Sequence, residues 1–203
     1  MAVESVVSFH KGLPPHEFFP KAWASEPLTN VLKETNIPFA LPMPDEEFSL
    51  VAQERDLIIG QCSANKATKY WTHLQTIHGD EENLSTRLFI AIHQKAVQDE
   101  QAYLRQIGES PETALHSAGI AVLPEHRGRQ LGLQMRERQI ALCKESKMTT
   151  LFCETTNHYS AATLEGFGFT KIAQYPYAEL AEELKHPSLS ALDDSFTVWC
   201  LRV

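Results

Sequence analysis

The sequence lacks the patterns that mark a cysteine metal site, a membrane span or a signal peptide. Its four cysteines, at 62, 143, 153 and 200, form neither a CxxC pair nor another metal-binding spacing, so we expect free thiols and no bound metal. No apolar run reaches the roughly 18 residues that a membrane span needs. The N-terminal stretch MAVESVVSFH lacks the pattern of a signal peptide. We therefore expect a soluble, cytoplasmic protein with no membrane partner.

Basic charge is also in short supply. The formal net charge is -8 at pH 7, and nucleic-acid-binding proteins are usually basic, so we expect no nucleic-acid partner. An acidic surface instead suits a small cationic ligand, although acidity alone identifies none. The 203 residues, 43% of them hydrophobic, are enough for one sizeable core, and we expect a single domain over residues 1–203.

Apolar periodicity predicts strands alternating with helices. Such alternation favours an α/β protein built on a mixed sheet. The predicted strands are 3–9, 48–53, 57–64, 112–123, 149–155, 169–177 and 195–203. The predicted helices are a long one at 84–107, others at 131–146 and 159–167, one or two short helices within 14–35, and a helical or loop insert at 178–194.

A strand-to-helix corner carries the clearest chemical signal. The stretch VLPEHRGRQLGLQMRERQI, residues 122–140, ends a strand and begins a helix within a few residues. Backbone N–H groups at a helix start are unpaired and attract anions. Arg127 and Arg129 add donors suited to phosphate, and Gly128 and Gly132 let a large anion approach. Neither a Walker loop nor a GxGxxG fingerprint is present, and the alternative is a simple turn with solvated arginines.

This corner resembles the acetyl-CoA signature of the GNAT superfamily of N-acetyltransferases, Q/R-x-x-G-x-G/A. The signature spans Arg127-Gly128-Arg129-Gln130-Leu131-Gly132 here, with Gln130 at a position where the family prefers glycine. The resemblance implies an α/β GNAT fold, a mixed and mostly antiparallel sheet of about seven strands flanked by helices. It also implies acetyl-CoA as co-substrate, held by this corner and by the preceding strand at Ile120, Ala121 and Val122.

A second block supports the same family. ETTNHYSAATLEGFGFTKI, residues 154–172, resembles the N-x-x-[AS]…GF pattern, with Asn157 and Ser160 matching its start and Gly168-Phe169 its end. The match implies that Asn157 contributes to cofactor binding. The family often carries a tyrosine seven residues after the asparagine, which protonates the departing thiolate. Leu164 stands there, so another acid, or none, must serve.

Two short strings resemble one branch, the insect-type arylalkylamine N-acetyltransferases. They are SEPLTNVL, residues 25–32, and HYSA, residues 158–161. The branch implies direct acetyl transfer to a small primary amine, with Glu26 as the catalytic glutamate and Ser160 and Thr156 as active-site hydroxyls. At pH 7 only about one such amine in a thousand is neutral and nucleophilic, so a base must remove its proton. We expect a monomer or homodimer.

Several alternatives remain open at this stage. His116 on the predicted strand 112–123 is a rival base to Glu26, and Ser160 could be only a helix N-cap. His73, His78 and His93 show no metal pattern and are expected at the surface. The acceptor could instead be a polyamine, an aminoglycoside or a peptide amine. A catalytically inactive acyl-CoA-binding module is the alternative outside the enzymes.

Overall fold

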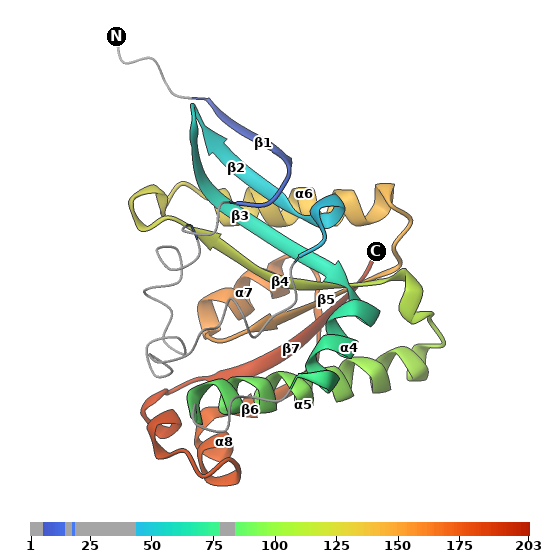
Figure 1. The fold of residues 1–203 in the computed structure, drawn as a ribbon, viewed down its shortest axis with the longest axis vertical. Helices are drawn as coiled ribbons and strands as arrows, with labels where there is room; N and C mark the ends of the chain where they lie inside the picture. The colour runs from blue at the N-terminus through green and yellow to red at the C-terminus, as the bar shows by residue number, and fades with distance from the viewer. Residues whose placement is uncertain (1–5, 15–17, 19–43, 78–83) are drawn as a thin grey trace.

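A single mixed sheet organises the protein. The computed structural model describes residues 6–14, 18, 44–77 and 84–203. Within them seven strands lie in the order β1-β2-β3-β4-β5-β7-β6 (Figure 1), and only the β4–β5 pair is parallel. The strands are β1 (Val7–Lys11), β2 (Leu50–Glu54), β3 (Leu57–Lys66), β4 (Ala114–Val122), β5 (Thr150–Thr155), β6 (Thr170–Pro176) and β7 (Ser195–Arg202). The predicted α/β class with a mostly antiparallel sheet of about seven strands is confirmed.

Helices cover both faces of the sheet. The described α-helices are α4 (Ala67–Thr76), α5 (Leu84–Ile107), α6 (Leu131–Glu145), α7 (His158–Gly166) and α8 (Tyr177–Glu183). The predicted long helix and the two helices after it are confirmed, and α8 lies in the predicted insert. The sequence missed α4, and the short helices predicted within 14–35 lie almost entirely outside the described residues. No helix in the described ranges has both the length and the apolar character needed to cross a membrane.

Strand alternation decides which side chains meet which helices. On one face, Ala114 of β4 and Phe152 of β5 pack with α4 and α5. On the other face, Leu115 and Leu151 pack with α6 and α7. Because successive side chains of a strand point to opposite faces, His116 projects toward α5, whereas Ser117 projects toward α6.

The sheet opens between its two parallel strands. β4 and β5 pair over only four residues, from Ala114 opposite Thr150 to Ser117 opposite Cys153. Directly after Ser117 the register between β4 and β3 shifts by one residue, and Gly119 adopts a φ of 128°, as expected at a bulge. The rest of β4 stays paired with β3 but leaves β5. We call this divergence the fork.

Candidate active site

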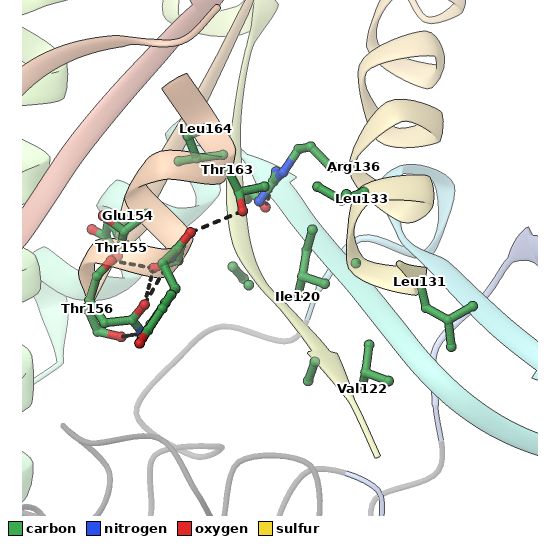
Figure 2. A pocket seen from close by; sticks show the side chains of 18 of the residues that line it. Ile120, Val122, Leu131, Leu133, Arg136, Glu154, Thr155, Thr156, Thr163 and Leu164 are labelled. Atoms are coloured by element: carbon green, nitrogen blue, oxygen red, sulfur yellow. Dashed lines mark hydrogen bonds between the residues drawn. The ribbon is translucent and has the colours of Figure 1, made fainter. Parts of the chain in front are cut away.

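A cavity of about 840 Å³ lies at the fork. Its walls come from β4 after Ser117, the start of α6, the end of β5 and the first turns of α7 (Figure 2). Ile120, Ala121 and Val122 line it, so the edge that β4 no longer shares with β5 faces the cavity. Side chains from α4 and α5 close the deep end. The fork therefore provides one continuous space that joins the two faces of the sheet.

The helix start that the sequence singled out forms one wall of this cavity. The first backbone hydrogen bond of α6 runs from Gln134 N–H to Gln130 C=O at 3.1 Å. The N–H groups of Leu131, Gly132 and Leu133 therefore have no acceptor within the helix, and all three residues line the cavity. They form a site suited to an anion.

The backbone of the corner explains its sequence. Gly128 has a φ of 76° and Gln130 a φ of 59°, both in the left-handed region that favours glycine. For a residue with a side chain this conformation costs roughly 1 kcal/mol or more. Gln130 bears this strain at the position where the family it resembles prefers glycine, and the left-handed turn is the physical reason for that preference.

The two arginines of the corner have different surroundings. Arg127 lines the cavity, and its Nε donates to the Val122 carbonyl at 3.2 Å. Arg129 instead donates from Nη2 to Glu54 Oε1 at 2.7 Å and is absent from the cavity wall. Of the two predicted cationic side chains, the structure brings only Arg127 to the cavity.

The start of α7 forms the opposite wall. Asn157 is the N-cap, because its side chain accepts from Ser160 N–H at 2.9 Å. The alternative that Ser160 is the N-cap is therefore wrong: its hydroxyl donates back to the Asn157 carbonyl at 2.9 Å. Thr156, Asn157, Ser160 and Leu164 all line the cavity. Glu26, the glutamate implied by the resemblance, lies outside the described residues.

Histidine 116 lies at the deep end of the cavity and is completely buried. Its Nδ1–H donates to Glu100 Oε1 of α5 at 2.9 Å. Glu100 Oε2 in turn accepts from the Trp71 indole at 2.6 Å. The ring of Tyr70 stacks on the imidazole with 3.5 Å between centroids. These contacts fix the orientation of the ring and leave its Nε2 directed toward β5.

Glutamate 154 is the first residue of β5 after the last β4 pair. Its Oε2 lies 3.2 Å from His93 Nε2, 3.4 Å from the Tyr70 hydroxyl and 3.8 Å from His116 Nε2. Glu154 Oε1 and His116 Nε2 are buried and accept or donate no hydrogen bond among the described residues. Buried polar atoms are nearly always paired, so these two atoms are available to a polar ligand or to water in the cavity.

Burial and charge set the protonation of this cluster. Burial lowers the pKa of His116, but the carboxylates of Glu100 and Glu154 outweigh burial, and the net shift is upward. Burial lowers the pKa of His93 to about 4, although its bond to the Phe89 carbonyl opposes the shift. Burial also raises the pKa of Glu154 well above the ordinary range of a carboxyl group, against the attraction of His116.

The proton between His93 and Glu154 follows from the hydrogen bonds. A carbonyl only accepts, so His93 Nδ1, 2.7 Å from the Phe89 carbonyl, carries hydrogen and Nε2 of the neutral ring is a bare acceptor. Glu154 therefore holds the shared proton and donates it to His93, which agrees with its raised pKa. A carboxyl group that releases its proton near neutral pH is suited to general acid–base work.

The same cluster has the ligand types of a metal site. One donor atom each from Glu100, His116 and Glu154 lies within 4.8 Å of the others. However, His116 Nδ1 already bonds Glu100, and Trp71 occupies the second oxygen of that carboxylate. These hydrogen bonds already account for the close approach of His116 and Glu100.

Comparison with known proteins agrees with the fold. The sequence model described as "Acetyltransferase (GNAT) family" matches residues 15–169. The chain belongs to the GNAT acetyltransferase family. No curated protein sequence matches it.

Solved structures share the GNAT fold at low sequence identity. One is the polyamine N-acetyltransferase of Drosophila melanogaster, which catalyses the formation of N-acetylagmatine: it is 17% identical with a TM-score of 0.65, covering 98% of this chain and all of its own. Arylalkylamine N-acetyltransferase 2 from Aedes aegypti is 14% identical with a TM-score of 0.69, covering 97% and 98%. The C-terminal condensation domain of Ebony, in complex with β-alanyl-dopamine, is 12% identical with a TM-score of 0.70, covering 98% and 100%.

Several residues of this GNAT cavity were missed at the level of sequence. The expectation that His93 lies at the surface is wrong, because this residue of α5 is only 6% exposed. Glu100 and Glu154 were not singled out. A signal existed for the helix: His93, Ala96 and Glu100 share the buried stripe of α5, and polar residues inside an apolar stripe are unusual.

We predict that the pKa values of His93 and His116, the two histidines of this cluster, are shifted in opposite directions. His93 should remain neutral until about pH 4, whereas His116 should keep its proton above the ordinary histidine pKa. Long-range proton–nitrogen NMR correlations of the rings, followed against pH and assigned with His93→Gln and His116→Gln, measure both. Two rings titrating together near the free-histidine value would contradict this electrostatic picture.

Proposed function

We propose that this GNAT acetyltransferase transfers the acetyl group of acetyl-CoA directly to a small primary amine, with an arylalkylamine as the preferred acceptor. The observation that carries the proposal is the cavity itself. It joins an anion-binding helix start on one face of the sheet to a buried acid–base cluster on the other. The helix start suits the phosphates of an acyl donor, and the acid–base cluster suits a cationic acceptor that must lose a proton.

The residues present fit acetyl-CoA. The unpaired N–H groups of Leu131 and Gly132, with the Arg127 guanidinium beside them, suit its diphosphate. The free edge of β4 at Ile120, Ala121 and Val122 suits the amides of the pantetheine arm, because strand edges offer unused N–H and C=O groups. Acetyl-CoA supplies the activated acyl carbonyl. Gln130 and Asn157, which also line the cavity, complete this part of the proposed site.

The acid–base cluster can remove the proton that the amine must lose. An ammonium group with a pKa of about 10.4 must lose its proton before it can attack. We propose that Glu154, once ionised, accepts this proton through its unpaired Oε1, while the Tyr70 hydroxyl and His116 hold the carboxylate in place. An ordinary carboxylate is a weak base. The raised pKa of Glu154 brings it closer to the pKa of the ammonium group and so makes it a stronger base. Glu26 remains a predicted contributor from outside the described residues, and Ser160 and Thr156 remain proposed active-site hydroxyls.

The residues that line the cavity near the acid–base cluster suggest which class of amine is the acceptor. Phe89, Phe196 and Tyr70 line the cavity beside His93 and Glu154, and such rings suit an aromatic amine. The solved relatives named above include an arylalkylamine N-acetyltransferase and a polyamine N-acetyltransferase. Agmatine and the polyamines are therefore the second candidates, favoured by the buried carboxylates that would attract an extended cation.

An acceptor panel tests the function directly. The protein is mixed with acetyl-CoA and tyramine, dopamine, serotonin, agmatine or spermidine, and free thiol is followed with a chromogenic disulfide. We expect thiol release with a higher kcat/KM for the arylalkylamines. A higher value for agmatine or spermidine selects the second candidate. Acetyl-CoA binding without turnover on any amine would indicate an inactive binding module.

We predict that the corner arginines differ in their effect on acetyl-CoA. Arg127→Ala should raise the KM for acetyl-CoA about tenfold, the loss expected for one charge-assisted hydrogen bond. Arg129→Ala is the matched comparison and should have a smaller effect, because its guanidinium is committed to Glu54. Steady-state kinetics at a fixed amine concentration measures the KM for acetyl-CoA of both variants. Equal increases in KM would contradict the proposed contact between Arg127 and the diphosphate.

We predict that Glu154→Gln lowers kcat/KM about 10²-fold or more, the usual contribution of a general base. The amide keeps a donor for His93 but cannot accept the proton. In the wild type kcat/KM should rise with pH through the raised pKa of Glu154, because the carboxyl must be ionised to act, and the variant should lose this rise. Glu165→Gln, an exposed carboxylate of α7, is the control. A Glu154→Gln enzyme with wild-type activity and pH profile would exclude Glu154 as the base.

A further inference from the structure

Arginine 136 is a buried cation at the fork, on the face opposite Glu154. It belongs to α6, is 6% exposed and lines the cavity. Its Nη1 donates to Ser117 Oγ at 3.0 Å, to Cys153 Sγ at 3.1 Å and to Gln139 Oε1. Ser117 and Cys153 form the last residue pair between β4 and β5. The guanidinium is thus anchored at the point where the two strands part.

The charge of Arg136 has no anion beside it. None of the ion pairs among the described residues includes this guanidinium, and its buried Nε donates to no described acceptor. Its hydrogen-bond partners are neutral, and an aromatic ring, that of Phe169, lies 5.8 Å away. Burying an unpaired charge costs several kcal/mol, and arginine cannot shed its proton. The arrangement indicates that an anion completes this part of the cavity.

On the neighbouring wall of α7, the hydroxyl groups of Thr163 and Ser160 have no free proton for such an anion, and Tyr159, which also lines the cavity, is 76% exposed. Figure 2 shows Arg136 extending from α6 toward Thr163 and Leu164. The Thr163 hydroxyl donates to the Tyr159 carbonyl at 3.1 Å, and the Ser160 hydroxyl donates to the Asn157 carbonyl. Leu164 is apolar. Within the described wall, both hydroxyl protons are already committed to the helix backbone, and the guanidinium carries the available positive charge.

We propose that Arg136 stabilises the coenzyme A thiolate that departs during transfer. The inference rests on the proposed function, because that function supplies the thiolate. The amine nitrogen attacks the thioester carbonyl, the C–N bond forms, and the C–S bond breaks with its electron pair leaving on sulfur. Glu154 has by then passed the ammonium proton to water, and it accepts the second proton that the nitrogen loses as the amide forms. The sulfur then carries a full negative charge on the α6 side of the fork, where Arg136 meets it, and takes a proton from water on release.

The protein's own thiols show that this guanidinium opposes the effect of burial on a thiol pKa without overcoming it. Burial raises the pKa of the Cys153 thiol to about 11, and the adjacent Arg136 guanidinium is the main influence that opposes this rise. Burial likewise raises the pKa of Cys62 to about 12 against the same cation. The proposal requires the coenzyme thiol to meet the unpaired side of the guanidinium at the open cavity, where burial opposes the charge less than it does at Cys153. Its pKa should therefore fall below that of the free thiol.

The test measures the pKa of the bound coenzyme thiol. Calorimetry first establishes saturation with free coenzyme A, and the thiolate absorbance near 240 nm is then titrated against pH, with the spectrum of the protein alone subtracted. We expect the thiol pKa in the wild-type complex to lie about one to three units below that of free coenzyme A, as for other groups beside an opposite charge. Arg136→Gln should remove this shift, and Arg136→Lys should restore part of it.

The controls separate Arg136 from the rest of the account. Arg138→Gln removes an arginine two residues along α6 whose guanidinium stacks on Phe9 and which does not line the cavity, so the shift should persist. A bound wild-type thiol with an unshifted pKa overturns the inference without any variant, while the proposed function stands. Absence of coenzyme A binding overturns both. A wild-type preference for malonyl-CoA or succinyl-CoA over acetyl-CoA that Arg136→Gln abolishes also overturns it, because the anion would then be an acyl carboxylate.

Discussion

The divergence of β4 and β5 after four residue pairs is the constraint on which the site depends. Two parallel strands that stayed paired would bury their edges in each other and leave no passage through the sheet. The bulge around Gly119 turns β4 away, and the freed edge becomes the wall of a cavity. The same geometry sets Ser117 and Cys153 under α6 and leaves Glu154 beside α5, so one fork presents a cation on one face and a carboxyl group on the other.

The charges on the two faces of the sheet suit different substrates. The α6 face has unpaired amides and two arginines at the cavity, Arg127 and Arg136, and suits the anionic donor and its leaving group. The α5 face holds Glu154 with two histidines and suits a cationic acceptor that must lose a proton. Of these groups, Arg136 is a buried charge whose cost the described residues do not fully offset, and uncompensated groups of this kind are common at functional sites.

Local patterns predicted the parts of this structure that local interactions determine. The long helix α5, the strand β4 and the corner before α6 follow from apolar periodicity, proline and glycine. Helix α4 was missed because Lys66 offers no side-chain cap and because Tyr70, Trp71 and the threonines favour strands. The acid–base cluster brings α4, α5, β4 and β5 together across long sequence separations, so no short motif reveals it. His116 was recognised only as an alternative, and the stripe of α5 that holds His93 and Glu100 resembled an ordinary amphipathic helix.

The crystal structure of the complex with acetyl-CoA tests the central claim most directly. The account predicts the diphosphate against the N–H groups of Leu131 and Gly132, the pantetheine arm along β4, and the thioester at the fork between Arg136 and Glu154. A coenzyme bound elsewhere on the protein, or one whose thioester lies outside the fork, would contradict it.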